Sequence, residues 1–200
     1  MSTNEPSWRE LAAAGHAGDE PTARMALGST DAARRELAVG ALHRMQALTD
    51  ADLAAAANDA HPAVRRRAAT ITAERPHAPL LGLLHDADPT VVEVAAWAAG
   101  ERECSDDDVI ARLVHLATEA DDALVREAAV AALGATGDER GLPAILAGCT
   151  DKPAVRRRAV LALAPFDGPD VQAALDAALQ DRDWQVRQSA EDIAPFVRGE

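Results

Sequence analysis

Aromatic residues are scarce in this 200-residue chain, which has three tryptophans, two phenylalanines and no tyrosine. Any core must therefore be built from aliphatic and small side chains, above all alanine. No segment long enough to cross a bilayer is free of charged residues, which argues against a membrane-spanning helix. No segment alternates polar and apolar residues as a half-buried strand does. These absences favour a helical protein with a thin, alanine-lined core.

Sequence features of catalysis and metal binding are also missing. The chain has two cysteines, Cys104 and Cys149, without the spacing of a metal site, and its six histidines form no HExxH pair. There is no glycine-rich phosphate loop and no nucleophile elbow. We therefore expect no metal ion, no cofactor and no catalytic residue. The cysteines are interpreted as reduced thiols of a cytoplasmic protein, with a redox pair as the alternative, and the first residues show no secretory signal.

The chain is acidic, with a formal net charge of −13. Proteins that bind nucleic acid gain affinity mainly from Lys and Arg that neutralise phosphates, so this charge disfavours a nucleic-acid partner. It disfavours an anionic membrane surface for the same reason. The acidic charge is compatible with partners of cationic or mixed charge.

A sequence pattern recurs at intervals of about 31 residues. The segment Asp59-Ala-His-Pro-Ala-Val-Arg-Arg-Arg-Ala68 closely matches Thr150-Asp-Lys-Pro-Ala-Val-Arg-Arg-Arg-Ala159. Weaker copies are present elsewhere, and the aligned anchor positions are Ala33, Val64, Val91, Val125, Val155 and Val186. A fixed period of this size is typical of stacked supersecondary units, which form extended binding surfaces.

Each repeat is predicted to be a pair of helices joined by a short acidic turn. Pro62, Pro89 and Pro153 lie two residues before an anchor, where proline suits the first turn of the second helix. The first helices are expected at Ala51–Ala57, Pro79–His85, Asp107–Ala117, Glu139–Ala147 and Asp170–Leu179. The predicted fold is an all-α, right-handed solenoid of about six helix pairs.

An additional helix over Trp8–Ala14 is expected to cover one end of the stack. Ser7 and Glu10 have the spacing of its capping box. Residues 1–19 then form an N-terminal capping helix, and residues 20–200 form the repeat array as a single domain. Terminal repeats need such a cover because their outer face would otherwise expose the core.

The repeat that contains Val125 carries a family resemblance. Val125-Arg-Glu-Ala-Ala-Val-Ala-Ala-Leu-Gly134, followed by Gly137-Asp-Glu-Arg-Gly-Leu-Pro-Ala-Ile-Leu146, resembles the short bacterial HEAT repeats of the phycobilisome-lyase type. The resemblance extends over roughly residues 20–195. It implies the helix-pair fold, but members of this group include scaffolds, maturation factors, chromophore lyases and DNA glycosylases, so it implies no single function.

One position directly after the anchor is arginine in five repeats. These residues are Arg34, Arg65, Arg126, Arg156 and Arg187, whereas the third repeat has Val92. The position lies at the border of the buried face, and acidic turn residues such as Asp59, Asp151 and Asp181 are nearby in the sequence pattern. We expect each arginine to bridge turns of the same or the next repeat, which is a structural role.

The exposed face of the second helices is expected to line a concave groove. Helical spacing places Arg66 and Arg67 there, then Glu93 and Glu127, then Arg157 and Arg158. This would give basic, acidic and basic bands along the groove. The bands are interpreted either as an ordinary solvated face or as a docking surface of alternating charge.

Trp97 is the most informative single residue on this face. It occupies the predicted exposed position of its helix at which the other repeats have Val39, Thr70, Ala131, Leu161 and Asp192, and Glu101 follows one helical turn later. A large aromatic residue among small neighbours is typical of a binding hot spot. The alternative is that the third repeat is rotated, so that Trp97 fills the core.

The leading interpretation is a non-enzymatic scaffold or adaptor, monomeric or weakly dimeric, that holds a protein segment in its groove. The partner segment is expected to combine basic and apolar character. One alternative is a DNA glycosylase resembling the HEAT-like alkylpurine enzymes, with Trp97 and Glu101 between arginines. Another is a lyase-like or maturation factor that holds a client protein during its modification.

Overall fold

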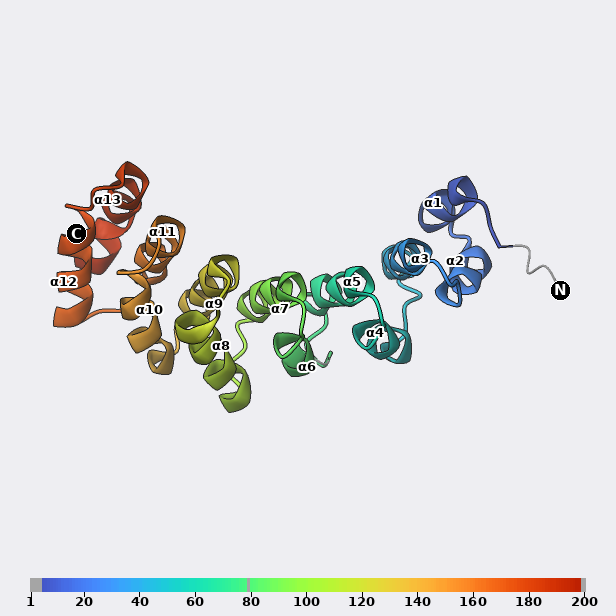
Figure 1. The fold of residues 1–200 in the computed structure, drawn as a ribbon, viewed down its shortest axis with the longest axis horizontal. Coiled ribbons are helices and arrows are strands. Elements are labelled where there is room, and N and C mark those ends of the chain that lie inside the picture. The colour runs from blue at the N-terminus through green and yellow to red at the C-terminus, as the bar shows by residue number, and fades with distance from the viewer. Residues whose placement is uncertain (1–4, 79, 199–200) are drawn as a thin grey trace. The chain divides into compact units, whose positions relative to one another are not determined.

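A computed structural model describes residues 5–78 and 80–198, and every regular element in these stretches is helical, as predicted (Figure 1). The chain divides into two compact units, residues 1–83 (unit 1) and residues 84–200 (unit 2). In both units the helices follow the predicted order, in which a first helix, a turn and a second helix repeat. Pro79, expected to begin a first helix, lies outside the described residues.

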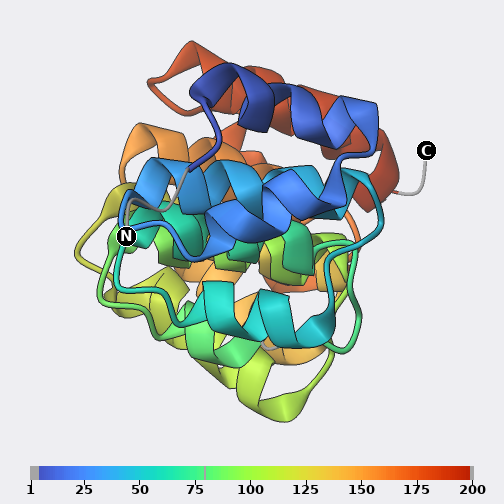
Figure 2. The same ribbon diagram turned by 90° about the vertical axis from the view of Figure 1, so that its right-hand side faces the viewer.

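Unit 1 contains a capping helix and two complete helix pairs. Its helices are α1 (Trp8–Ala17), α2 (Glu20–Leu27), α3 (Ala32–Arg44), α4 (Asp50–Ala57) and α5 (Pro62–Thr72), and α6 (Leu80–Leu84) lies at the boundary between the units. The first three helices lie side by side (Figure 2). Leu11 of α1 packs with Ala26 and Ala38 in a small buried cluster. α2, which the sequence analysis did not identify, is the first helix of the first pair.

The capping box expected at the start of α1 is present. The Ser7 hydroxyl accepts a hydrogen bond from the backbone N–H of Glu10 at 3.3 Å. The Glu10 carboxylate accepts one from the backbone N–H of Ser7 at 2.8 Å. Two backbone donors that a helix start leaves without partners are thus satisfied.

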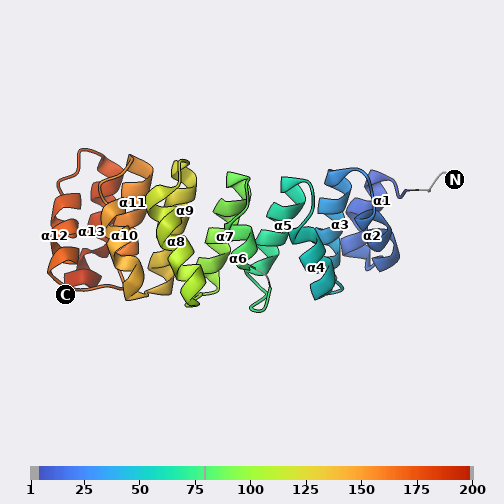
Figure 3. The ribbon, with the colours of Figure 1, turned by 60° about the horizontal axis from the view of Figure 1, so that its bottom comes forward.

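Unit 2 contains three complete pairs in addition to α7. Its elements are α7 (Pro89–Glu101), α8 (Asp107–Glu119), α9 (Ala123–Thr136), the 3-10 turn η1 (Glu139–Gly141), α10 (Leu142–Gly148), α11 (Pro153–Ala162), α12 (Pro169–Ala178) and α13 (Trp184–Arg198). The second helices α7, α9, α11 and α13 form one layer in which each packs on the next (Figure 3). The first helices α8, α10 and α12 form the other layer.

The acidic turns start the second helices in the manner that the sequence predicts. Asp88 and Asp122 are the N-cap residues of α7 and α9, and each accepts a hydrogen bond from a backbone N–H at 2.9 Å. Pro62, Pro89 and Pro153 are the first residues of their helices. An N-cap carboxylate and a proline without an N–H both suit a helix start, because the first N–H groups have no partner within the helix.

Glycine and alanine allow neighbouring second helices to approach closely in unit 2. A Cβ atom placed on Gly134 of α9 would lie 2.5 Å from Cβ and 2.7 Å from Cα of Ala162 on α11. A Cβ atom on Gly100 of α7 would lie 3.0 Å from Cα of Ala132 on α9. The same arrangement therefore recurs one repeat apart, and it lets helices pack closely around a core with few aromatic side chains.

Candidate binding groove and the arginine ladder

Arginines of the second helices join consecutive repeats in unit 2. Arg126 donates hydrogen bonds from Nε and Nη2 to both carboxylate oxygens of Asp151, at 2.6 and 2.9 Å. Arg156 does the same with Asp181, at 2.8 Å for both bonds. The remaining Nη1 atoms donate to the backbone carbonyls of Ala120 and Asp151, respectively. Each guanidinium thus ties the turn before its own helix to the turn of the next repeat, an arrangement that we call the arginine ladder.

The first repeat takes part in the ladder through a residue other than the predicted Arg34. Asp31 caps α3, so the position four residues later, which is the ladder position in the other repeats, is Arg35. Arg35 donates from Nε and Nη2 to Asp59, at 2.7 Å for both bonds. The alignment on Ala33 is therefore one residue too early. Consistent with this shift, Val39 is buried rather than exposed in the groove.

Arg34 instead fastens the start of the capping helix. Its Nη1 donates to the backbone carbonyl of Pro6, and its Nε lies 3.7 Å from a carboxylate oxygen of Glu5. Its guanidinium carbon lies 4.6 Å from the centre of the Trp8 ring, within the range of a cation–π contact. The residue is structural, but it acts on the N-terminal segment and not on the next turn.

The other predicted ladder arginines bind backbone carbonyls of their own turns. Arg65 Nη1 donates to the Asp59 carbonyl at 2.9 Å, and Arg187 Nη1 donates to the Asp181 carbonyl at 2.7 Å. Val92 takes the ladder position in α7 and is buried at 4% exposure. Between α7 and the following turn the ladder therefore has no arginine.

The ladder makes the stability of unit 2 depend on acid pH. The Arg126 and Arg156 guanidinium groups, by donating hydrogen bonds, lower the pKa values of the Asp151 and Asp181 carboxyl groups. Because these pKa values are lower in the folded state, the two ion pairs contribute fully to the free energy of unfolding above the unfolded-state pKa, which is about 3.9. This contribution to stability is lost as the pH falls through the lower pKa values of the folded state.

We expect Asp181→Asn to destabilise the protein at neutral pH and to matter progressively less below about pH 4. Denaturant unfolding of the wild type and the variant at a series of pH values measures this difference. The matched control is Asp167→Asn, at an exposed position outside the ladder. A wild-type-to-variant difference that stays constant down to the acid end of the series would contradict the argument.

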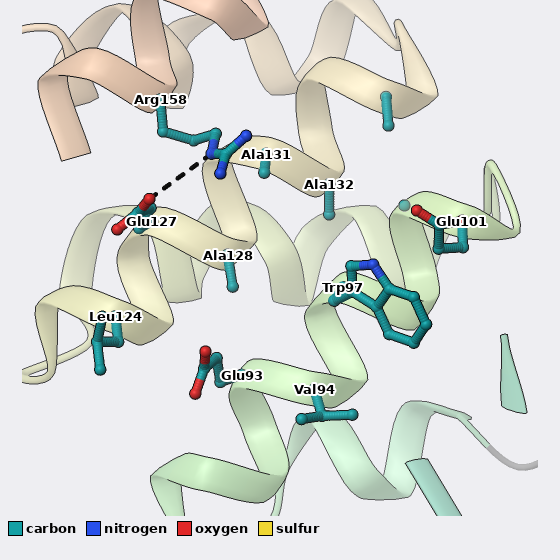
Figure 4. Close-up of a pocket in the computed structure, with 12 residues that line it drawn as sticks. Glu93, Val94, Trp97, Glu101, Leu124, Glu127, Ala128, Ala131, Ala132 and Arg158 are labelled. Atoms are coloured by element: carbon teal, nitrogen blue, oxygen red, sulfur yellow. Dashed lines mark ion pairs between the residues drawn. The ribbon is translucent and has the colours of Figure 1, made fainter. Parts of the chain in front are cut away.

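A hollow of about 590 Å³ opens on the outer face of the second helices in unit 2 (Figure 4). α7, α9 and α11 line it, and we call it the Trp97 hollow. Trp97 is 45% exposed and does not fill the core. Ala128, Ala131 and Ala132 lie across from it, so small side chains leave the indole accessible. Leu124, at the other end of the hollow, is 57% exposed and was not identified from the sequence.

Three predicted acidic residues line this hollow, in different electrostatic settings. Glu127 is paired, since Nη2 of Arg157 and Nε of Arg158 lie 3.6 and 3.7 Å from one of its carboxylate oxygens. Glu93 and Glu101 have no ion-pair partner in the part of the chain that the structure describes. The end formed by α7 therefore carries negative charge that no described residue neutralises, whereas the charges of α9 and α11 are partly balanced.

A second hollow, of about 500 Å³, adjoins the first one repeat further along. It is lined by α9, α11 and α13, and it shares Ala131, Ala135 and Arg158 with the Trp97 hollow. Phe196 of α13, 74% exposed, and Leu161 of α11 lie in its wall, so we call it the Phe196 hollow. The two hollows together are the groove of unit 2. Phe196 was missed in the sequence, although helical counting from Val186 places it at the same position as Glu101 in α7.

The remaining predicted groove residues, Arg66 and Arg67, belong to unit 1. Arg67 Nη2 lies 3.0 Å from a carboxylate oxygen of Glu36, and Arg66 is exposed on α5. Neither lines the groove of unit 2. Their role in binding a partner therefore stays a prediction.

The remaining candidates from the sequence are metal ligands, a redox pair of cysteines and a membrane-spanning helix. In the described residues no three His, Cys, Asp or Glu side chains come together to hold a metal ion. Both cysteines are free thiols, and burial raises the pKa of Cys149 to about 12. Among the described helices, none combines the length and apolar character needed to cross a membrane.

The family comparison identifies HEAT repeats in this sequence. The family model matches residues 49–134, 76–164 and 122–193. No curated protein matches the chain.

Solved structures share the fold at low sequence identity. YibA of Escherichia coli has a TM-score of 0.71 at 18% identity, over 94% of this chain and 71% of that one. The complex of CpcE and CpcF of phycocyanin lyase from Nostoc has a TM-score of 0.61 at 21% identity, over 95% of this chain and 77% of that one. A designed armadillo repeat protein, in complex with the peptide (KR)4, has a TM-score of 0.59 at 18% identity, over 94% of this chain and 96% of that one. These likenesses show a stacked helical-repeat fold.

Proposed function

The chain belongs to the HEAT-repeat family, because the matched repeats span well over half of its length, and we propose that it is a non-enzymatic protein-binding scaffold. The groove of unit 2 is the proposed docking surface. The proposed setting is the cytoplasm, where both cysteines would stay reduced.

The observation that carries this proposal is the exposure of Trp97 inside a hollow. A tryptophan that is 45% exposed leaves a large apolar surface in water, which costs free energy unless a partner covers it. Tryptophan is also among the residues most enriched at binding hot spots. The small side chains of Ala128 and Ala131 keep the indole accessible.

The charge of the groove indicates the chemistry of the partner. Glu93 and Glu101 flank Trp97 on the same helix, and the chain as a whole has a net charge of −13. Cationic segments are attracted by such a surface, and an Arg or Lys side chain can also stack on the indole face. The designed armadillo repeat protein with the (KR)4 peptide is a stacked-repeat protein in complex with a basic peptide. This likeness supports a basic partner segment here.

The same charges disfavour the glycosylase alternative. An enzyme that handles DNA needs cationic side chains along the path of the phosphates. In the groove of unit 2, Arg157 and Arg158 are paired with Glu127, and Glu93 and Glu101 would repel a phosphate backbone. The balance of charge in this groove therefore supports a protein partner over nucleic acid.

We expect Trp97→Ala to weaken partner binding by about 2 kcal/mol, which is a factor of about 30 in affinity. The melting temperature should change little, because the indole is not part of the core. Co-purification from the native cell with the wild type and the variant identifies the partner, and calorimetric titration with that partner then gives the affinities.

The matched control is Trp184→Ala, which removes an equally large side chain at 65% exposure outside both hollows. This variant should retain the partner. Equal retention by both variants would show that the groove around Trp97 is not the docking surface. A large drop in melting temperature for Trp97→Ala would show that the indole is needed for folding.

A further inference from the structure

The two hollows of unit 2 adjoin each other and differ in chemistry. In the Trp97 hollow, an exposed indole stands between the carboxylates of Glu93 and Glu101. In the Phe196 hollow the wall is mostly apolar, with Leu161, Pro165, Ile193 and Phe196, and it includes no acidic residue. A cation is therefore favoured at one site and an uncharged apolar side chain at the other.

We infer that the groove takes an extended peptide segment with two anchors, a basic residue over Trp97 and a large apolar residue in the Phe196 hollow. This inference rests on the proposed function and specifies its ligand. The segment runs along the layer of second helices, from α7 across α9 and α11 to α13.

The helix layer fixes the spacing of the two anchors. The basic anchor lies over Trp97, where α7 faces α9, and the apolar anchor lies where α11 faces α13, so the two anchors are about two helix spacings apart. Packed helices are about 8–10 Å apart, and an extended chain advances about 3.3–3.6 Å per residue. Two spacings, about 16–20 Å, therefore separate the two anchors by about five residues.

The distribution of charge fixes the order of the anchors along the groove. Glu93 and Glu101 have no ion-pair partner among the described residues, so they attract the cation at the α7 end. At the junction of the two hollows, Arg157 and Arg158 share the single carboxylate of Glu127, so a net positive charge remains that disfavours a second cation. A peptide whose anchors are both basic is thus a poorer fit than one basic and one apolar anchor.

The test begins with a library of short random peptides displayed on phage, selected on the wild-type protein and counter-selected on Trp97→Ala. The expected consensus is an Arg or Lys and a Leu, Ile, Phe or Met about five positions apart. The best peptide is then synthesised, and its affinity is measured by fluorescence anisotropy for the protein and its variants.

Two variants assign each anchor to its hollow. Replacing the basic residue of the peptide with Gln should weaken binding to the wild type about tenfold, and have no further effect on Glu93→Gln/Glu101→Gln. Replacing the apolar residue with Ala should weaken binding to the wild type about tenfold, and have little effect on Phe196→Ala. Glu191→Gln, an exposed carboxylate of α13 outside both hollows, is the control and should bind like the wild type. Two glycines inserted between the anchors should cost as much as losing one anchor.

The possible results separate this inference from the proposed function. Peptides that depend on Trp97 but lack the basic residue, or that tolerate the glycine insertion, overturn the two-anchor inference and leave the docking surface in place. A selection that yields no Trp97-dependent peptide counts against both. Both the docking surface and the two-anchor inference are supported if each peptide substitution loses its effect only in the variant of its own hollow.

Discussion

Replacing Arg156 with alanine is expected to lower the free energy of unfolding by about 3 kcal/mol, because breaking a buried ion pair leaves an uncompensated charge. The Arg156 and Asp181 side chains are only 8% and 14% exposed, so water screens the pair weakly. The substitution also removes the donor to the Asp151 carbonyl. Arg66→Ala, at an exposed position of α5, is the matched control and should change stability by less than about 0.5 kcal/mol. Chemical denaturation of both variants measures the difference.

The double variant Arg156→Ala/Asp181→Asn tests the cause. If the lost charge pair is responsible, the double variant should be less destabilised than the sum of the two single variants, because Asp181 no longer remains as an unpaired charge. Equal stability of Arg156→Ala and Arg66→Ala would show that the ladder contributes nothing measurable. Strict additivity would assign the loss to packing of the arginine side chain.

The repeats, their helix starts and the ladder could be predicted because each depends on residues that are close together in the sequence. A proline two residues before the anchor fixes the first turn of α5, α7 and α11. The first repeat was misaligned because Arg34 and Arg35 are adjacent and no proline marks the start of α3. Only the N-cap contact of Asp31 with the Ala33 N–H decides which arginine reaches Asp59.

The environment of Trp97 could not be decided from sequence, because α7 is apolar on almost every face. Val91, Val92, Ala95, Ala96, Ala98 and Ala99 are all buried. Such a helix has a weak periodic signal, so neither an exposed nor a buried tryptophan contradicts it. The exposure of Trp97 follows from the neighbouring helix, where alanines leave the space over the indole open. The second hollow could not be predicted from the sequence, because it forms only where α13 packs against α11.

Substituting Gly134 with alanine is expected to destabilise the protein by about 3 kcal/mol, although alanine is the better helix former by about 1 kcal/mol. The added Cβ would lie 2.5 Å from Cβ and 2.7 Å from Cα of Ala162, so α9 and α11 would have to move apart. The Ala162 backbone cannot rotate away from the added atom as a flexible side chain could. Because α9 and α11 line both hollows, moving these helices apart would also change the shape of the groove. Gly82→Ala is the matched control, since among the described residues no atom beyond its own helical turn lies within 4 Å of the Cβ it adds to α6, and it should be neutral or slightly stabilising. Thermal and denaturant unfolding of the two variants compares them, and a stabilised Gly134→Ala protein would show that the helices are not held at this separation.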